Sequence, residues 1–132
     1  MTANTSPIFT LTPRISGSPI DIANTARDGT GTISTIITGT TNGTRINRIN
    51  IKASGSQTVA GTIRLFIYDG TTNFLWREVL VTAIIASGSV ATFESITNLS
   101  GEYALILPNN YSLKASTNNA ESFNIIAEGG DY

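Results

Sequence analysis

The sequence predicts an all-β protein built as a single antiparallel sandwich. Short runs rich in Ile, Val and Thr recur along the chain, and each run ends at Gly, Asn, Asp or Pro. No window has the 3.6-residue apolar spacing of an amphipathic helix, so we expect no helix longer than about two turns. Turn residues at roughly every tenth position are typical of a sandwich or a jelly roll. We therefore predict a jelly-roll-like sandwich.

The predicted strands cover most of the chain. They span residues 8–11, 32–38, 45–53, 62–68, 74–82, 90–96, 103–107, 111–116 and 123–127. Two dipeptides, Asn42-Gly43 and Asp69-Gly70, tolerate the positive φ that tight hairpin turns need. They separate consecutive strands and predict hairpin turns at these positions.

The first 28 residues have a different pattern from the rest. Pro7, Pro13 and Pro19 are evenly spaced, and the pieces between them are short. Because proline cannot donate a hydrogen bond to a central strand, this spacing argues against a long interior strand. We predict an extended N-terminal arm over residues 1–28, lying over the sandwich or reaching a neighbour, and a sandwich domain over residues 29–132.

Alternation within residues 45–53 indicates a half-buried strand. Ile49, Ile51 and Ala53 point to one side, and polar or charged residues separate them. Such alternation places apolar side chains toward a core and polar side chains toward solvent. We expect these three residues to be buried.

The hairpin around Asp69-Gly70 predicts a specific register. It pairs Tyr68 with Phe74, Phe66 with Trp76 and Arg64 with Glu78. One face of this hairpin then carries an aromatic cluster and an ion pair. The other face has fewer charges and is the predicted core face; its residues are Ile63, Leu65, Ile67, Val79 and Val81.

The aromatic hairpin face needs a cover, which we expect to be the arm or another subunit. Apolar residues near the start of the chain are available for such a contact. The candidate interface residues are Ile8, Phe9, Leu11, Phe66, Tyr68, Phe74 and Trp76.

Composition excludes several classes of function. The chain has no Cys and no His, which removes disulfide scaffolds and the usual ligands of zinc and copper. Charged residues are 13% of the chain, the net charge is −1 and the basic residues are scattered. Nucleic acid and anionic membranes are therefore not expected partners, and no cofactor is expected. The start has no signal-peptide pattern, so we expect synthesis in the cytoplasm of a host cell.

No catalytic motif stands out. Without His or Cys, a nucleophile would need a Ser–Lys arrangement or a pair of carboxylates, and neither is indicated. Asp28-Gly29 and Asp69-Gly70 are better explained as turns than as calcium loops. Four aromatic residues, Tyr68, Trp76, Tyr103 and Tyr111, suit either packing or sugar stacking, and packing is favoured. We expect a protein that is not an enzyme.

Several stretches resemble small, mostly unannotated proteins encoded in phages and prophages. The resemblance covers nearly the whole chain. It is carried by Pro7-Ile8-Phe9-Thr10-Leu11-Thr12-Pro13, Ala23-Asn24-Thr25-Ala26, Asp28-Gly29-Thr30-Gly31-Thr32, Asn42-Gly43-Thr44-Arg45-Ile46, Arg64-Leu65-Phe66-Ile67, Leu75-Trp76, Leu107-Pro108, Tyr111-Ser112-Leu113 and Glu128-Gly129-Gly130-Asp131-Tyr132.

This resemblance implies a β-sandwich component of a virion. The role it implies is a capsid decoration or auxiliary head protein that binds and stabilises the phage shell. Its partners would be the major capsid protein, or another virion protein, and further copies of itself, with a homotrimer as the first expectation because shells offer three-fold sites. The alternative is a carbohydrate-binding module of a phage tail or fibre that contacts host glycans.

Overall fold

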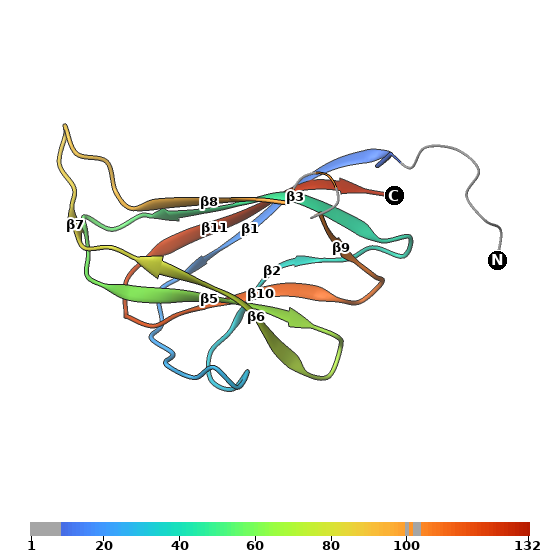
Figure 1. The fold of residues 1–132 in the computed structure, drawn as a ribbon, viewed down its shortest axis with the longest axis horizontal. Helices are drawn as coiled ribbons and strands as arrows, with labels where there is room; N and C mark the ends of the chain where they lie inside the picture. Colours follow the sequence, from blue (N-terminus) through green and yellow to red (C-terminus); the bar gives the residue numbers. More distant parts are fainter. Residues whose placement is uncertain (1–8, 100, 102–103) are drawn as a thin grey trace.

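The computed structural model describes residues 9–99, 101 and 104–132, and it is an all-β sandwich (Figure 1). No α-helix occurs in these residues, which confirms the expectation of no long helix. The strands are β1 (Thr12–Ile20), β2 (Ser34–Thr38), β3 (Thr44–Ala53), β4 (Gln57–Thr58), β5 (Gly61–Tyr68), β6 (Asn73–Val81), β7 (Ile84–Ile85), β8 (Glu94–Asn98), β9 (Leu105–Leu107), β10 (Ser112–Thr117) and β11 (Phe123–Asp131).

Two antiparallel sheets pack face to face. The five-stranded sheet has the order β1-β11-β3-β8, and β9 also pairs with β3. The four-stranded sheet has the order β2-β10-β5-β6. A third, two-stranded sheet of β4 and β7 lies at one end of the sandwich (Figure 1). The chain therefore passes repeatedly from one large sheet to the other.

The core forms between the two large sheets, where the alternating apolar residues meet. Ile49, Ile51 and Ala53 of β3 are buried, as their alternation predicted. The predicted core face of the hairpin is also confirmed, because Ile63, Leu65 and Val81 are buried and Ile67 and Val79 pack against the same cluster. Strands from both sheets contribute to one continuous core.

The N-terminal region differs from the predicted arm, because residues 12–20 form strand β1 of the five-stranded sheet. All nine residues pair with β11. Pro13 and Pro19 fit there because β1 is an edge strand, where proline leaves no central hydrogen bond unmade. Side chains of β1 also reach β2: Arg14 Nη1 donates to Thr38 O at 2.7 Å, and Ser16 Oγ donates to Ile36 O at 2.8 Å. The sandwich therefore begins at Thr12.

The β5–β6 hairpin follows the predicted register only near its base. Arg64 lies opposite Glu78, as expected, but a β-bulge between Leu65 and Phe66 shifts the rest. Phe66 then faces Leu75, and Tyr68 faces Asn73. The predicted pairing of Phe66 with Trp76 is wrong, because the bulge inserts Trp76 as an extra residue of β6. Both predicted turns have the expected positive φ, which is 96° at Gly43 and 98° at Gly70. The hairpin predicted at Gly43 is wrong, however, because β2 and β3 belong to different sheets.

Residues 21–33, which we call the strap, connect β1 to β2 along the outer face of the four-stranded sheet (Figure 1). The backbone carbonyl of Asn24 accepts a hydrogen bond from Arg64 Nη1 at 3.1 Å. Farther along, Gly29 O accepts one from Asn73 Nδ2 at 3.2 Å. Phe66 lies on this outer face between Arg64 and Tyr68 and is fully buried. Part of the predicted arm segment therefore contacts the sheet on both sides of Phe66.

Candidate functional site

Large apolar side chains are exposed in groups at three places on the surface, and Ile22, Ile96 and Ile106 are exposed elsewhere. One place is the start of the chain and β1, a second is the edge strand β6, and a third is the end formed by β4 and β7. The residues are Phe9, Leu11 and Ile15 at the first, Phe74, Leu75 and Leu80 at the second, and Val59, Ile85 and Val90 at the third. Grouped exposed apolar residues indicate interaction surfaces more often than isolated ones do.

The first group, which we call the N-terminal ridge, consists of Phe9, Leu11 and Ile15. Their exposed fractions are 77%, 84% and 71%. Leu11 N donates to Asp131 O at 2.8 Å, so the backbone here is still attached to the C-terminal strand. The first described residues lie near the C-terminus (Figure 1). Ile8, the remaining predicted interface residue of this segment, lies outside the described residues.

The aromatic interface candidates do not form one cluster. Phe66 is fully buried, whereas Phe74 on the edge strand is 54% exposed. Trp76 is half-buried and packs against the main core, and the Arg77 guanidinium lies 4.8 Å from the centre of its ring. Tyr68 is on the outer face of the four-stranded sheet, with the Lys114 ammonium 3.7 Å from its ring centre. The bulge in β6 separates these side chains onto two faces.

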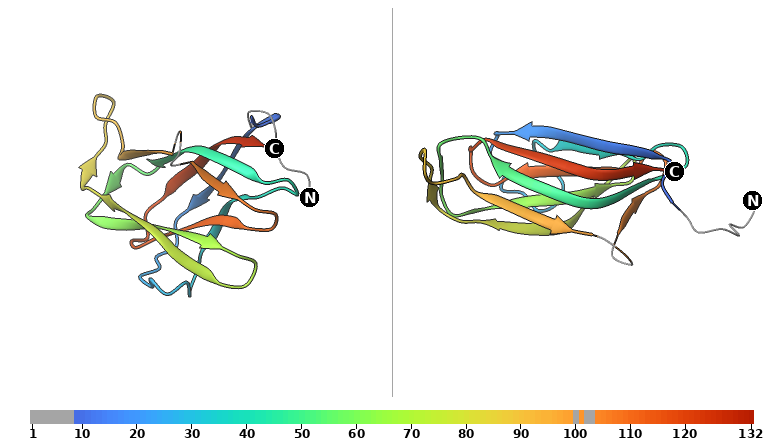
Figure 2. Two further views of the ribbon diagram at one scale, coloured as in Figure 1. Left: turned by 45° about the vertical axis from the view of Figure 1, so that its right-hand side comes forward. Right: turned by 90° about the horizontal axis from the view of Figure 1, so that it is seen from above.

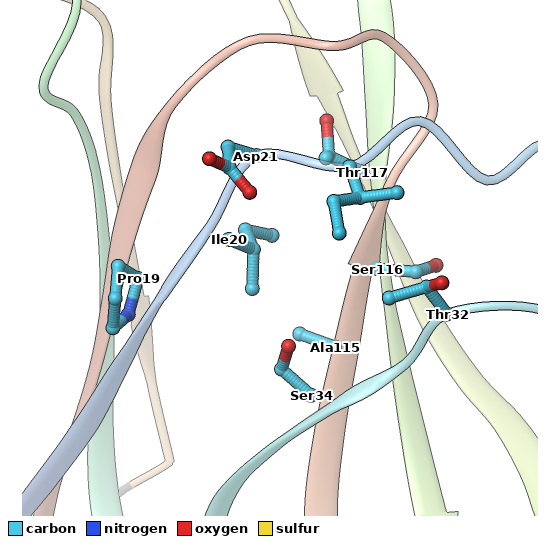
Figure 3. Close-up of a pocket in the computed structure, with 9 residues that line it drawn as sticks. Pro19, Ile20, Asp21, Thr32, Ser34, Ala115, Ser116 and Thr117 are labelled. Carbon is cyan, nitrogen blue, oxygen red and sulfur yellow. The ribbon is translucent and has the colours of Figure 1, made fainter.

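A small hollow opens between the end of β1 and strands β2 and β10 (Figure 3). Its volume is about 40 Å³, which suits ordered water better than an organic ligand. Asp21 supplies its carboxylate at the rim, and the hydroxyl groups of Thr32 and Ser116 point away from the centre in Figure 3. Asp21 is the one acidic residue that lines the hollow, so the hollow does not hold a pair of carboxylates.

Ion pairs join strands and the strap at several points. Arg14 contacts Asp131 at 3.2 Å, and Thr44 Oγ1 donates to the same carboxylate at 2.7 Å. On the outer face of the five-stranded sheet Arg48 pairs with Glu128, and this hydrogen-bonded carboxylate raises the pKa of Arg48. These partners face one another across strands, so their role is to hold the register of the sheets.

The buried Arg64 is the most desolvated charge among the described residues. Its side chain is 2% exposed, and it donates to Asn24 O and to Asn118 Oδ1, both at 3.1 Å. Glu78 lies 3.6 Å from Arg64 Nε and also binds Arg27 of the strap at 3.0 Å. This arrangement fixes the strap to the sheet. Sequence reasoning found the Arg64–Glu78 pair and missed the strap's part in it.

The third exposed group lies at the end of the sandwich where β4 pairs with β7, and sequence reasoning did not single it out. A signal was available, because residues 79–93 contain no Asp, Glu, Lys or Arg. Figure 2 shows that this end projects beyond the two large sheets.

No family model, curated protein or solved structure matches the chain. Among the described residues, no three metal-binding side chains come together as a metal site requires. In the same part of the chain, no helix is long and apolar enough to cross a membrane.

Proposed function

We propose that the chain is a structural protein of a phage particle, a capsid decoration or auxiliary head protein that works by packing and not by catalysis. In this role it binds the major capsid protein and stabilises the shell, and it associates as a homotrimer on the particle. The motifs that resemble phage and prophage proteins supply the biological context for this proposal.

The order of the strands supports it. Strands β1-β11-β3-β8 face strands β2-β10-β5-β6. The chain alternates between the two large sheets except at the β5–β6 hairpin and at β8 and β9, which both pair with β3. We interpret this strand order as that of a jelly roll, an architecture that recurs in viral capsid domains and in lectins. Because one fold serves many functions, the choice between these roles depends on the surface.

The N-terminal ridge is the observation that carries the proposal. Phe9, Leu11 and Ile15 are each more than two thirds exposed and lie on or beside a strand that β11 holds in place. A segment of this kind can pack on another protein, or add a strand to its sheet, with main-chain hydrogen bonds and few charges to desolvate. We assign the shell as the surface on which the ridge packs.

The competing role, glycan binding, would use a row of exposed aromatic rings. Trp76 instead packs against the core and Phe66 is buried. Lys114 covers one face of Tyr68. The aromatic residues of the hairpin therefore favour the particle role.

Co-sedimentation with empty phage heads tests the proposal. The heads are assembled from the major capsid protein of the phage or prophage that encodes this chain. We expect the full chain to sediment with the heads and the triple variant Phe9→Ser, Leu11→Ser, Ile15→Ser to stay in the supernatant. Ile96→Ser, a matched change at a side chain that is 46% exposed on β8, should leave sedimentation unchanged. Absence of the full chain from the head pellet, together with binding to host surface glycans, would overturn the shell role in favour of the glycan role.

A further inference from the structure

One asparagine of the chain is followed directly by glycine, and this pair lies in the turn between β2 and β3. The pair is Asn42-Gly43. Within the turn, Gly43 N donates to Thr40 O at 2.9 Å, and Gly43 has a φ of 96°, which glycine adopts without strain. The Asn42 side chain is exposed to solvent. A chemically reactive pair of residues therefore lies on the surface.

An asparagine that precedes glycine can lose its side-chain amide without an enzyme. The Gly43 nitrogen gives up its proton to a base in the solvent and forms a bond to Cγ of Asn42, and ammonia leaves. Water then opens the resulting succinimide ring at either carbonyl, which yields aspartate or isoaspartate. Water is consumed and ammonia is released, so the reaction needs neither an oxidant nor a reductant. Glycine hinders this attack least, because it has no Cβ beside the attacking nitrogen.

The surroundings of the turn leave room for the ring. The side-chain hydrogen bonds of the turn are made by its two threonines: Thr40 Oγ1 donates to Gly43 O at 3.2 Å, and Thr44 Oγ1 accepts from Thr40 N at 3.1 Å. A Cβ placed on Gly43 would meet Leu107 O, its nearest neighbour, only at 3.5 Å. The ring that joins Asn42 to Gly43 can therefore form without a clash on this side of the turn.

Two aspartates also precede glycine and could form the same ring, but hydrogen bonds hold their carboxylates. Asp69 Oδ1 accepts from Thr72 N at 2.7 Å, and Asp28 Oδ1 accepts from Thr30 Oγ1 at 2.6 Å. These hydrogen bonds lower the pKa of both carboxyl groups. An ionised carboxylate held in this way is a poor target for the nitrogen of the next residue. The structure thus distinguishes Asn42-Gly43 from both aspartate–glycine pairs.

The hydrogen bonds of the turn limit how often the nitrogen is free to react. The Gly43 nitrogen is the nucleophile, and its hydrogen bond to Thr40 O has to open before it can reach Cγ of Asn42. The hydrogen bond from Thr40 Oγ1 to Gly43 O closes the same turn. Opening of an exposed turn costs much less free energy than global unfolding, because few buried contacts are lost.

We propose that Asn42 is a site of spontaneous deamidation, which converts it to aspartate and isoaspartate while the chain is folded. Each conversion adds one negative charge to a chain whose net charge is −1. Isoaspartate also adds one carbon atom to the main chain just before Gly43, whose carbonyl accepts from Tyr132 N at 3.1 Å. The modification therefore loosens the end of β11, to which Leu11 of the N-terminal ridge is attached. It needs no partner and does not depend on the proposed function.

Peptide mapping by mass spectrometry tests the site on the full chain, incubated at mildly alkaline pH well below its melting temperature. The peptide that contains Asn42 should gain the mass difference between an oxygen atom and an NH group, and should divide into an aspartate and an isoaspartate peak. This conversion should be at least about tenfold faster than at any other asparagine. Asn42→Gln should lose the reaction, because the longer side chain disfavours the ring. Asn98→Gln, a matched change at an exposed residue of β8, should leave the rate at Asn42 unchanged.

Thr40→Ala tests the part played by the turn. This variant lacks the hydrogen bond from Thr40 Oγ1 to Gly43 O, so conversion of Asn42 should be about twofold to tenfold faster, with circular dichroism showing that the chain stays folded. An unchanged rate in Thr40→Ala would refute control by the turn. Conversion of Asn42 in urea but not in the folded chain, or at a rate no higher than at the other asparagines, would overturn the proposal. The isoaspartate form, separated by ion exchange, should melt at a lower temperature than the unmodified chain, and an equal melting temperature would refute the effect on β11.

Discussion

Replacement of Phe66 by alanine tests the strap and the bulge together. Phe66 is fully buried although it lies on the face of β5 opposite the main core. Its neighbours across the sheet are Leu75 of β6 and Lys114 of β10, and the strap contacts the sheet on either side of it. If the strap completes this burial, the Phe66 ring contributes as much to the free energy of unfolding as a side chain of the central core does.

The expected loss follows from the burial of the whole ring. Phe→Ala at a buried position lowers the free energy of unfolding by about 3–5 kcal/mol. A chain of this length is stable by roughly 7–20 kcal/mol, so the variant should fold with a melting temperature lower by about 10–20 °C. Leu75→Ala is the control, because Leu75 is 38% exposed and its loss should cost about 1 kcal/mol or less.

A double-mutant cycle connects this loss to the strap. The Asn24 side chain closes the strap by donating to Thr30 O at 2.9 Å and to Thr32 O at 3.0 Å. Asn24→Ala should therefore loosen the cover over Phe66, and the two changes together should cost less than their sum by about 0.5–3 kcal/mol. Urea unfolding of the four proteins measures this coupling. Equal losses for Phe66→Ala and Leu75→Ala, or strict additivity with Asn24→Ala, would refute the burial of Phe66 beneath the strap.

Three further predictions concern other parts of the chain. Gly129→Ala should lower the free energy of unfolding in urea by at least about 2 kcal/mol, because an added Cβ would lie 1.8 Å from Arg45 O at the β3–β11 bulge. The control Gly55→Ala should leave the free energy of unfolding unchanged, because the space around Gly55 is open. Removal of residues 1–11 should leave the fluorescence maximum of Trp76, the single Trp, unchanged, since Trp76 packs against the core; a red shift would contradict that packing. Hydrogen bonds from Thr72 N and Thr71 N lower the pKa of Asp69 below its ordinary 3.8, so its contribution to stability is present above that value and is lost as the pH falls through the folded-state pKa. The amide oxygen of Asp69→Asn can accept the same hydrogen bonds and does not titrate. On acidification from neutral pH to below 3.8, the melting temperature of this variant should therefore fall by less than that of the wild type, and an equal fall would count against this assignment.

The sequence by itself determined the all-β class, most of the strands and the inward side of the hairpin. The reason is local: alternation of apolar and polar residues sets which side of a strand is buried, as Ile49, Ile51 and Ala53 show. Turn chemistry is equally local, and it placed turns at Gly43 and Gly70, of which the second closes a hairpin. These features need no knowledge of distant residues.

Only the tertiary structure decided that residues 12–20 form strand β1, how β5 and β6 pair beyond Leu65, and which segment covers Phe66. Strand β1 has few apolar residues, and its nine pairs are with β11, more than a hundred residues later in the chain. The bulge moves Trp76 out of its predicted pairing with Phe66, and the residues of the Asp69-Gly70 turn give no sign of it. The strap reaches Arg64 and Asn73 through backbone carbonyls, which any residue could provide. Contacts of this kind depend on which distant segments meet, and a local pattern of side chains carries no information about that meeting.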